Sequence, residues 1–323
     1  MEADKQTHQF KPGSTFENAL ALYEFDTTLR QLLFSAIQRI EVALRSRIIH
    51  HFSMQYGAFW FMEMQLHISE HRFLENLTTL DREVSRSKEE FIKEHFHNYD
   101  KPEFPPAWKT LELASFGTLS KLYYNFADKK VKKQIARDFN LPQHEVLESW
   151  MRSLAALRNH CAHHARLWNR YLNATPQLSV RLRGLWINNR QVDANKLYAV
   201  LCCMVYWLDA MGHGEKFKSD LFQLLSTYPS VDTAAMGFPN DWQNEPLWKG
   251  YPDDATPAEI CEIKGHQYLY NHASLASKAI CARCHKKWVA DYTGAPIHDD
   301  IWKEVDAFKG ESRSDEELIE KWV

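Results

Sequence analysis

Apolar residues recur every three or four positions through most of the first 226 residues, which is the spacing of amphipathic α-helices. The clearest stripe lies in residues 16–52 and predicts one long helix, or two with a break; it consists of Leu22, Phe25, Leu29, Leu33, Ile37, Ile40, Leu44 and Ile48. The same spacing predicts helices over residues 67–84, 88–96, 116–126, 129–139, 142–169, 194–211 and 215–226. The pattern therefore predicts an all-α helical bundle.

Three stretches fall outside this helical pattern. Residues 180–192 alternate weakly between apolar and polar and predict a small hairpin. Residues 228–257 are rich in Pro, Gly, Asp and Asn, so we expect an extended arm or linker on the main domain. Near the C-terminus, Ser314 and Glu317 form a capping-box pattern that predicts a short acidic helix. We therefore expect a helical domain of residues 1–250 and a small C-terminal appendage of residues 256–323.

The composition is that of a soluble globular protein, because 323 residues with 45% hydrophobic and 25% charged side chains suffice for a large core. The net charge of −3 argues against a protein that coats polyanions, so any nucleic acid would bind local basic patches. The most apolar run, residues 197–211, is too short to cross a membrane and contains Asp209; it predicts a buried helix. The first twelve residues lack the apolar core of a signal peptide, and we expect a cytoplasmic protein without a membrane partner.

Residues 157–170, with the sequence LRNHCAHHARLWNR, carry the side chains best suited to chemistry. RNA can be cut without a metal if imidazoles move the protons of the 2′-hydroxyl and the 5′-oxygen while a guanidinium stabilises the phosphorane. Asn159 and His163 are four residues apart, so on a helix the amide can hydrogen-bond the imidazole. Arg158 and His163 diverge by roughly 140° around a helix, so two copies facing each other would enclose one phosphate better than one copy. The segment therefore favours a homodimeric site.

Two other interpretations of this segment stay open. An arginine, an amide and a histidine also serve ordinary hydrogen bonding between helices, in a partly buried structural element. His160, His163 and His164 also have the three- and four-residue spacings that can hold a metal.

The segment resembles the signature of the HEPN superfamily, Arg-Asn-three residues-His, whose members are mostly RNA-cutting or RNA-binding helical domains. Residues 150–170, with residues 40–61 and the sequence LELASFGTLSKLYY at 111–124, are similar to the Abi-type abortive-infection proteins of bacterial phage defence. The resemblance covers residues 16–248. It implies a HEPN-like helical bundle.

The resemblance also implies an activity. A family member of this kind would be a metal-independent endoribonuclease toxin that works as a homodimer, leaves a cyclic phosphate and a 5′-hydroxyl, and is restrained until infection. Whether an antitoxin or a small RNA restrains it stays open. It implies catalytic roles for Arg158, Asn159 and His163. His164 is a second candidate because the family often doubles this histidine, and which of the two faces the phosphate stays open.

Basic residues near this segment are candidates for binding the RNA backbone. They are Lys129, Lys130, Lys132, Lys133, Arg166 and Arg170. A lysine run also fits the ordinary solvated face of a helix, and that alternative stays open.

The C-terminal cysteines predict a structural zinc site. Cys281 and Cys284 have the two-residue gap of a zinc knuckle, and Cys261 and His266 would complete four ligands. His272 or His285 could replace His266. The surrounding residues 258–292 contain little apolar sequence and would be hard to fold without a metal. The alternative is a flexible tail with reduced thiols.

The leading prediction is an antiphage abortive-infection protein that acts as an endoribonuclease without a catalytic cofactor, with RNA as its substrate. An alternative from another class is a non-catalytic RNA-binding or RNP scaffold protein of phage defence. A third is a phage-sensing protein that uses the C-terminal appendage.

Overall fold

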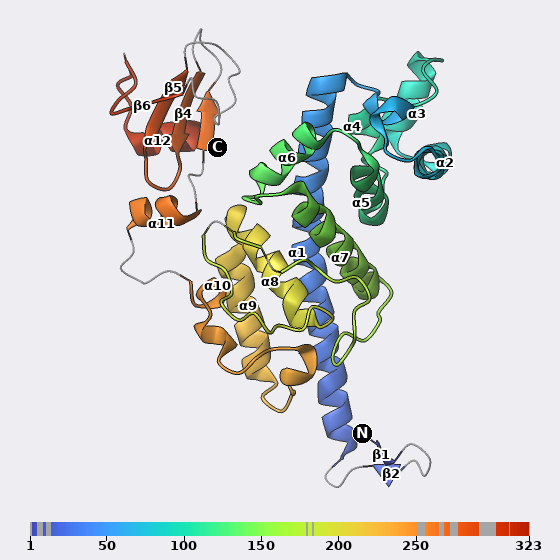
Figure 1. Ribbon diagram of the computed structural model, residues 1–323, viewed down its shortest axis with the longest axis vertical. Helices are drawn as coiled ribbons and strands as arrows, with labels where there is room; N and C mark the ends of the chain where they lie inside the picture. The colour runs from blue at the N-terminus through green and yellow to red at the C-terminus, as the bar shows by residue number, and fades with distance from the viewer. Residues whose placement is uncertain are drawn as a thin grey trace. The chain divides into compact units, whose positions relative to one another are not determined.

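A computed structural model describes residues 2–4, 9–10, 14–178, 180–182, 184–250, 256–264, 268–271, 277–290, 302–309 and 311–322. The chain divides into two compact units (Figure 1). The helical unit comprises Met1–Leu182 and Trp186–Trp248, and the C-terminal unit comprises Arg183–Leu185 and Lys249–Val323. Among the described residues, no helix combines the length and the apolarity needed to cross a lipid bilayer.

The helical unit is built along one long helix, α1 (Phe16–Tyr56). Thr15 caps its start by accepting a hydrogen bond from the backbone N–H of Asn18. It ends at Gly57, whose positive φ of 82° is a backbone angle that glycine adopts without strain. The helix has no break, and the apolar stripe predicted for it is buried from Phe25 onward. α1 therefore forms the central wall of the core.

The remaining elements of the helical unit are short strands, helices and 3₁₀ turns. Before α1, β1 (Glu2–Asp4) pairs antiparallel with β2 (Gln9–Phe10). After it come η1 (Trp60–Met62), η2 (Met64–Leu66), α2 (Glu70–Arg86), α3 (Glu90–Asn98), α4 (Ala107–Thr110), α5 (Phe116–Asn125), α6 (Lys129–Asp138), α7 (His144–Ala162), α8 (Leu197–Ala210), α9 (Gly214–Thr227), η3 (Ala234–Met236), η4 (Trp242–Asn244) and α10 (Pro246–Lys249). α1 contacts α6, α7, α8 and α9, and α7 also contacts α5, as Figure 1 shows in blue, green and yellow.

α8 is the most buried element, as its continuous apolar sequence predicts. Every residue from Leu197 to Asp209 is buried. The stretch expected to be an arm on the main domain covers this region with side chains that also enter the core, namely Met236, Phe238, Trp242, Leu247 and Trp248. Trp248 donates its indole N–H to the hydroxyl of Tyr198 on α8 at 3.0 Å. Residues up to Trp248 thus belong to one core.

Two local predictions for this unit are wrong. The described part of residues 180–192 contains no strand, so the hairpin expected there is a loop. The helix predicted over residues 142–169 ends at Ala162, seven residues early. Its apolar spacing continues through Leu167 and Trp168, which are buried although they follow a turn. The apolar spacing therefore continues beyond the helix because these residues are buried, although they are not helical.

The C-terminal unit is a small antiparallel sheet with two helices, so the all-α prediction is wrong for this unit, while the helical unit is helical apart from the short β1–β2 pair. Its elements are α11 (Pro257–Lys264), β3 (Tyr268–Asn271), β4 (Ser277–Cys281), β5 (Lys287–Ala290), β6 (Lys303–Val305) and α12 (Asp315–Trp322), with strand order β3-β4-β5-β6. The capping box at α12 is confirmed: Ser314 and Glu317 exchange backbone-to-side-chain hydrogen bonds. A small cluster of Ile280, Phe308 and Leu318 forms the core.

Candidate functional site

The candidate site begins at the end of α7, where the chain makes a left-handed turn. His163 caps the helix, and His164 follows with a φ of 53°. The N–H of His164 donates to the carbonyl of Cys161 at 3.2 Å, and that of Ala165 to the carbonyl of His160 at 2.9 Å. This pair of bonds is the Schellman motif, in which the left-handed position usually holds glycine. A histidine therefore occupies a strained backbone position here, as residues at functional sites often do.

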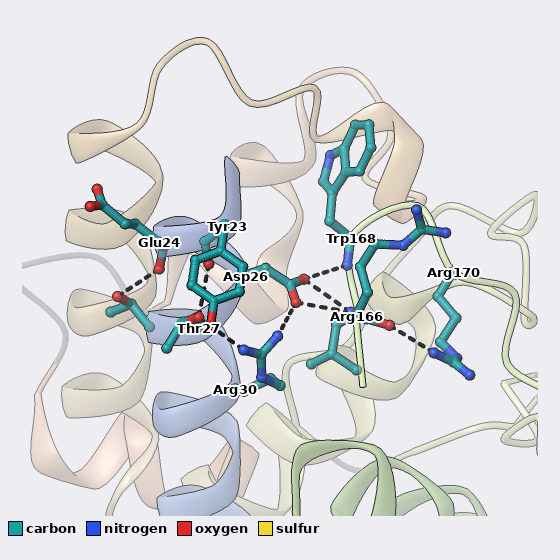
Figure 2. A network of polar contacts seen from close by, with 10 residues as sticks. Tyr23, Glu24, Asp26, Thr27, Arg30, Arg166, Trp168 and Arg170 are labelled. Carbon is teal, nitrogen blue, oxygen red and sulfur yellow. Dashed lines mark hydrogen bonds and ion pairs between the residues drawn. The ribbon is translucent and has the colours of Figure 1, made fainter. Parts of the chain in front are cut away.

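The chain after this turn is fixed to α1 by one buried carboxylate (Figure 2). Asp26 accepts hydrogen bonds from the backbone N–H groups of Trp168 at 2.7 Å and Leu167 at 3.0 Å. Its other partner is the guanidinium of Arg30, one turn along α1, which also donates to Thr27 at 2.9 Å. Asp26 and Arg30 are only 4% and 7% exposed. Since a buried charge requires such partners, this network holds residues 163–170 in place.

Several basic side chains lie on this turn, which we call the basic turn: His160, His163, His164, Arg166 and Arg170. Arg170 donates to the carbonyl of Arg166 at 2.9 Å, so its guanidinium folds back over the turn (Figure 2). Burial lowers the pKa of His160, and the charges of Arg170 and His163 lower it further. His163, His164 and Arg166 are exposed. The turn therefore offers imidazoles and guanidinium groups to an anionic ligand.

Arg158 and His164 lie around one aromatic side chain of α1. The guanidinium of Arg158 is 5.6 Å from the centre of the Phe34 ring. His164 and Phe34 line a cavity of about 350 Å³, together with Thr27, Arg30, Gln31, Cys161 and Ala162. The buried Nε of Arg158 has no hydrogen-bond partner among the described residues. The arginine that lies over Phe34 and the exposed imidazole that lines the cavity are both groups that suit a phosphate ligand.

Two other reactive groups lie near the site: the thiol of Cys161, which is held neutral, and the carboxyl of Glu41, which is ion-paired. Burial raises the pKa of the Cys161 thiol to about 12, so this cysteine is not a nucleophile near neutral pH. Burial also raises the pKa of the Glu41 carboxyl, which the charges of Arg45 and Arg158 oppose. Glu41 pairs with Arg45 at 2.8 Å. The arginines and histidines are therefore the groups of this site that can take part in chemistry.

Asn159 lines a different cavity from His164. It lines a space of about 850 Å³ between α2, α5 and α7, whose charged lining residues are Arg72, Lys121, Arg152, Glu75, Glu145 and Glu148. His163, predicted to pair with Asn159 on one helical face, is the C-cap residue of α7, and the pairing of their side chains stays a prediction. The bond between them joins the backbone N–H of His163 to the carbonyl of Asn159 at 3.0 Å. Arg158 and Asn159 therefore lie on different sides of α7, Arg158 over the Phe34 ring and Asn159 at this cavity.

The four predicted RNA-binding lysines of α6 are not equivalent. Lys129, Lys130 and Lys133 are exposed. Lys132 is 2% exposed and pairs with Glu148 at 2.8 Å while donating to the carbonyl of Tyr124 at 3.0 Å. Its ammonium is therefore occupied within the protein, and we leave Lys132 out of any RNA contact.

The C-terminal cysteines do come together. The Sγ atoms of Cys261, Cys281 and Cys284 lie within 4.8 Å of one another and could hold a metal ion. None of the three forms a disulfide. Burial raises the pKa of the Cys261 thiol to about 12. The fourth predicted ligand, His266, lies outside the described residues, as does His272.

Sequence reasoning missed the residues of α1 that support the site, Asp26, Arg30 and Phe34. A signal was present, because these residues step by four and flank the buried stripe at Phe25 and Leu29. A charged pair beside a buried stripe indicates a partner on another element. The sequence does not show that this partner is the backbone of residues 167–168.

Fold and site together define a helical protein with an arginine- and histidine-rich turn at the end of a buried helix, joined to a small cysteine-containing sheet unit. The chain belongs to the Abi-like protein family, which matches residues 1–169. The match covers α1 to α7 and the basic turn up to Asn169, and it confirms the resemblance to Abi-type proteins. Family membership supports a role in abortive infection, the class of phage defence to which the name refers. Neither a curated protein nor a solved structure matches the chain.

Proposed function

We propose that the protein serves abortive infection as a metal-independent endoribonuclease of the HEPN type. The observation that carries this proposal is that Arg158 lies over the Phe34 ring and that His164 lines a cavity with the same phenylalanine. The buried Nε of Arg158 has no hydrogen-bond partner among the described residues. Buried arginine nitrogens normally have partners, so this position favours a ligand.

The proposed reaction needs only proton transfer and charge stabilisation. One imidazole removes the proton from a ribose 2′-hydroxyl, and the 2′-oxygen attacks the adjacent phosphorus. The bond from phosphorus to the 5′-oxygen breaks, and a second imidazole gives that oxygen a proton. Arg158 stabilises the negative charge of the phosphorane. The products are a 2′,3′-cyclic phosphate and a 5′-hydroxyl, without any oxidant, reductant or metal. Any zinc at the cysteine cluster would be structural.

We assign the first imidazole to His164, because it lines the cavity that also contacts Phe34, and Arg158 lies over that ring. His163, one residue earlier and exposed at the helix cap, is the second candidate. Asn159 lines the cavity on the other side of α7, so it positions the helix end or contacts RNA beyond the cleaved phosphate. Arg166 and Arg170 would bind flanking phosphates, with the exposed Lys129, Lys130 and Lys133 as further contacts.

We also propose that the active form is a homodimer. Farther along α1 from Phe34 and His164 lies a second groove, of about 630 Å³, whose lining includes Val42, Ile49, Met54 and Trp108. Val42, Met54 and Trp108 are 61%, 77% and 52% exposed. A second copy docked on this face would cover these apolar side chains. It would also bring a second Arg158 and His164 to the same phosphate, which supplies both imidazoles of the reaction.

The test is cleavage of single-stranded RNA by the purified full chain in EDTA, with the 3′ ends of the products analysed for cyclic phosphate. Replacing Arg158, His163 or His164 by alanine should reduce cleavage, by about 10²–10⁴-fold for the histidine that transfers a proton. The matched control is His71→Ala, since His71 is an exposed histidine of α2 whose side chain is 81% exposed. Undiminished cleavage by both histidine variants would overturn the proposal.

A second candidate function is favoured by the positions of Arg158 and Asn159. Because Asn159 and Arg158 face different sides of α7, this helix end could grip a structured RNA without cutting it. Such a scaffold of phage defence would co-purify with a defined RNA, and a small RNA restraining the protein would appear in the same fraction. It would show no cleavage at any protein concentration, whereas Arg166→Ala would weaken RNA retention.

A further inference from the structure

We propose that Cys261, Cys281 and Cys284 are three ligands of a structural zinc ion that joins α11 to the β4–β5 hairpin of the C-terminal unit. The three residues come from different parts of that unit: α11, the end of β4 and the turn between β4 and β5. This site lies outside the residues that match the Abi-like family, and it is independent of the proposed ribonuclease chemistry.

The spacing of the sulfurs is that of a tetrahedral zinc site. Zinc binds thiolates at ≈ 2.3 Å, so two sulfurs on one tetrahedral ion are separated by roughly 3.8 Å. The Sγ atoms of Cys261 and Cys281 are 3.6 Å apart, and those of all three cysteines lie within 4.8 Å of one another. Cys261 and Cys281 are 2% and 0% exposed. A small inward shift of Cys284 would place all three sulfurs at bonding distance.

The backbone around Cys281 has the donors that a metal-bound thiolate needs. The N–H groups of Arg283 and Cys284 both donate to the Sγ of Cys281, at 3.4 Å and 3.5 Å. The chain then turns back through the left-handed residue His285, whose N–H donates to the carbonyl of Cys281 at 3.0 Å. Two N–H groups aimed at one sulfur stabilise a thiolate more than a neutral thiol. The turn is therefore already shaped as a zinc knuckle.

The charge of the site also fits a bound divalent ion. Three thiolates and Zn²⁺ carry a net charge of −1, which is costly in a buried place unless it is offset. The guanidinium of Arg283 donates to the Sγ of Cys261 at 3.7 Å and supplies the compensating positive charge. These contacts to the coordinating atoms are the kind that tune and orient metal ligands.

The size of the surrounding core explains what the metal would do. The buried apolar cluster of the C-terminal unit is Ile280, Phe308 and Leu318, with a few partly buried neighbours. A core of this size supplies little stability, and small units of this kind usually rely on a metal or a disulfide. Since the three cysteines form no disulfide, zinc coordination is the cross-link available to them. Thiolate ligands favour zinc over magnesium, calcium and manganese.

The first experiment measures the metal content of the full chain, purified without chelators, by inductively coupled plasma mass spectrometry. We expect one zinc per chain, and loss of that zinc in Cys281→Ser and Cys284→Ser. Cys203→Ser is the matched control, because Cys203 is a buried thiol of α8 outside the cluster; it should keep its zinc. Zinc that is substoichiometric, or equally present in the Cys281→Ser protein, is adventitious and overturns the proposal.

The second experiment does not depend on whether the variants fold. The wild-type chain is stripped of metal and titrated with Co²⁺, which reports thiolate ligands by charge-transfer absorption and tetrahedral geometry by its visible bands. We expect both signals to saturate at one Co²⁺ per chain and to disappear on addition of Zn²⁺. Absence of the charge-transfer absorption, or the colour of an iron–sulfur cluster in the protein as purified, contradicts a zinc site. RNA cleavage in EDTA is scored separately, so failure of either proposal leaves the other intact.

Discussion

Replacing His164 by glycine separates the chemical role of this residue from its structural cost. His164 has a φ of 53°, at the position of the Schellman motif that favours glycine. The left-handed conformation costs an L-residue about 1–2 kcal/mol of free energy. Glycine avoids this cost but loses about 0.4–1 kcal/mol through the greater freedom of the unfolded chain. The net stabilisation is then roughly 0.5–1 kcal/mol, and the variant should melt about 1–4 °C above the wild type for a unit of this size.

The same substitution removes the imidazole. If His164 transfers a proton in RNA cleavage, activity should fall about 10²–10⁴-fold while the melting temperature rises. Differential scanning calorimetry and a single-turnover cleavage assay on the same sample measure both quantities. A higher melting temperature together with a lower cleavage activity excludes unfolding as the cause of the lost activity.

Two control variants complete this test. His164→Ala removes the imidazole but keeps an L-residue at the strained position, so it should lose activity without gaining stability. His163→Gly changes the cap residue, whose φ of −93° gives glycine no advantage, and should melt below the wild type. A His164→Gly protein that melts lower than the wild type would refute the backbone argument, and one that cleaves RNA normally would refute the catalytic assignment.

Two further predictions concern stability. Asp26→Ala removes the partner of the buried Arg30 and the acceptor of two backbone N–H groups, so we expect a loss of roughly 3–5 kcal/mol in the free energy of unfolding, measured by urea denaturation. Glu24→Ala, an exposed carboxylate on the same helix, is the control and should change it by less than about 0.5 kcal/mol; equal effects would show that Asp26 does not hold the basic turn. Burial lowers the pKa of His67, whose Nε2 has no partner among the described residues. Below the ordinary histidine pKa the unfolded chain binds a proton that the folded chain does not, so stability should fall from pH 7 to pH 5. His67→Gln should reduce this fall, and an unchanged pH profile would contradict the assignment.

The long helix and the buried helix were predictable because their apolar positions follow one period without interruption. From Phe25 to Ile48 the stripe of α1 faces the core as expected, and α8 is buried on all sides as its composition indicates. Such elements depend on local pattern alone. The capping box of Ser314 and Glu317 was predictable for the same reason, since both partners lie within one turn.

The end of α7 was not predictable, because the residue that stops the helix is a histidine where the usual signal is glycine. Leu167 and Trp168 continue the apolar period past that point, since the chain stays buried after it turns. The burial of Lys132 was not predictable for a related reason: the residue belongs to a lysine run, and its ion-pair partner Glu148 is on another helix. The C-terminal sheet was not predictable, because its strands are only three to five residues long. The end of α7, the burial of Lys132 and the C-terminal sheet all depend on contacts between segments that are distant in the sequence.

The burial of α8 bears on how other members of the family can be built. The family match stops at residue 169, whereas α8 and the segment up to Trp248 complete the wall against which α1 and α7 pack. The family match and the folded core therefore end at different residues of this chain. A relative that shares only the matched stretch needs a substitute for α8, either a different apolar helix or a neighbouring subunit, before its basic turn can take the same shape.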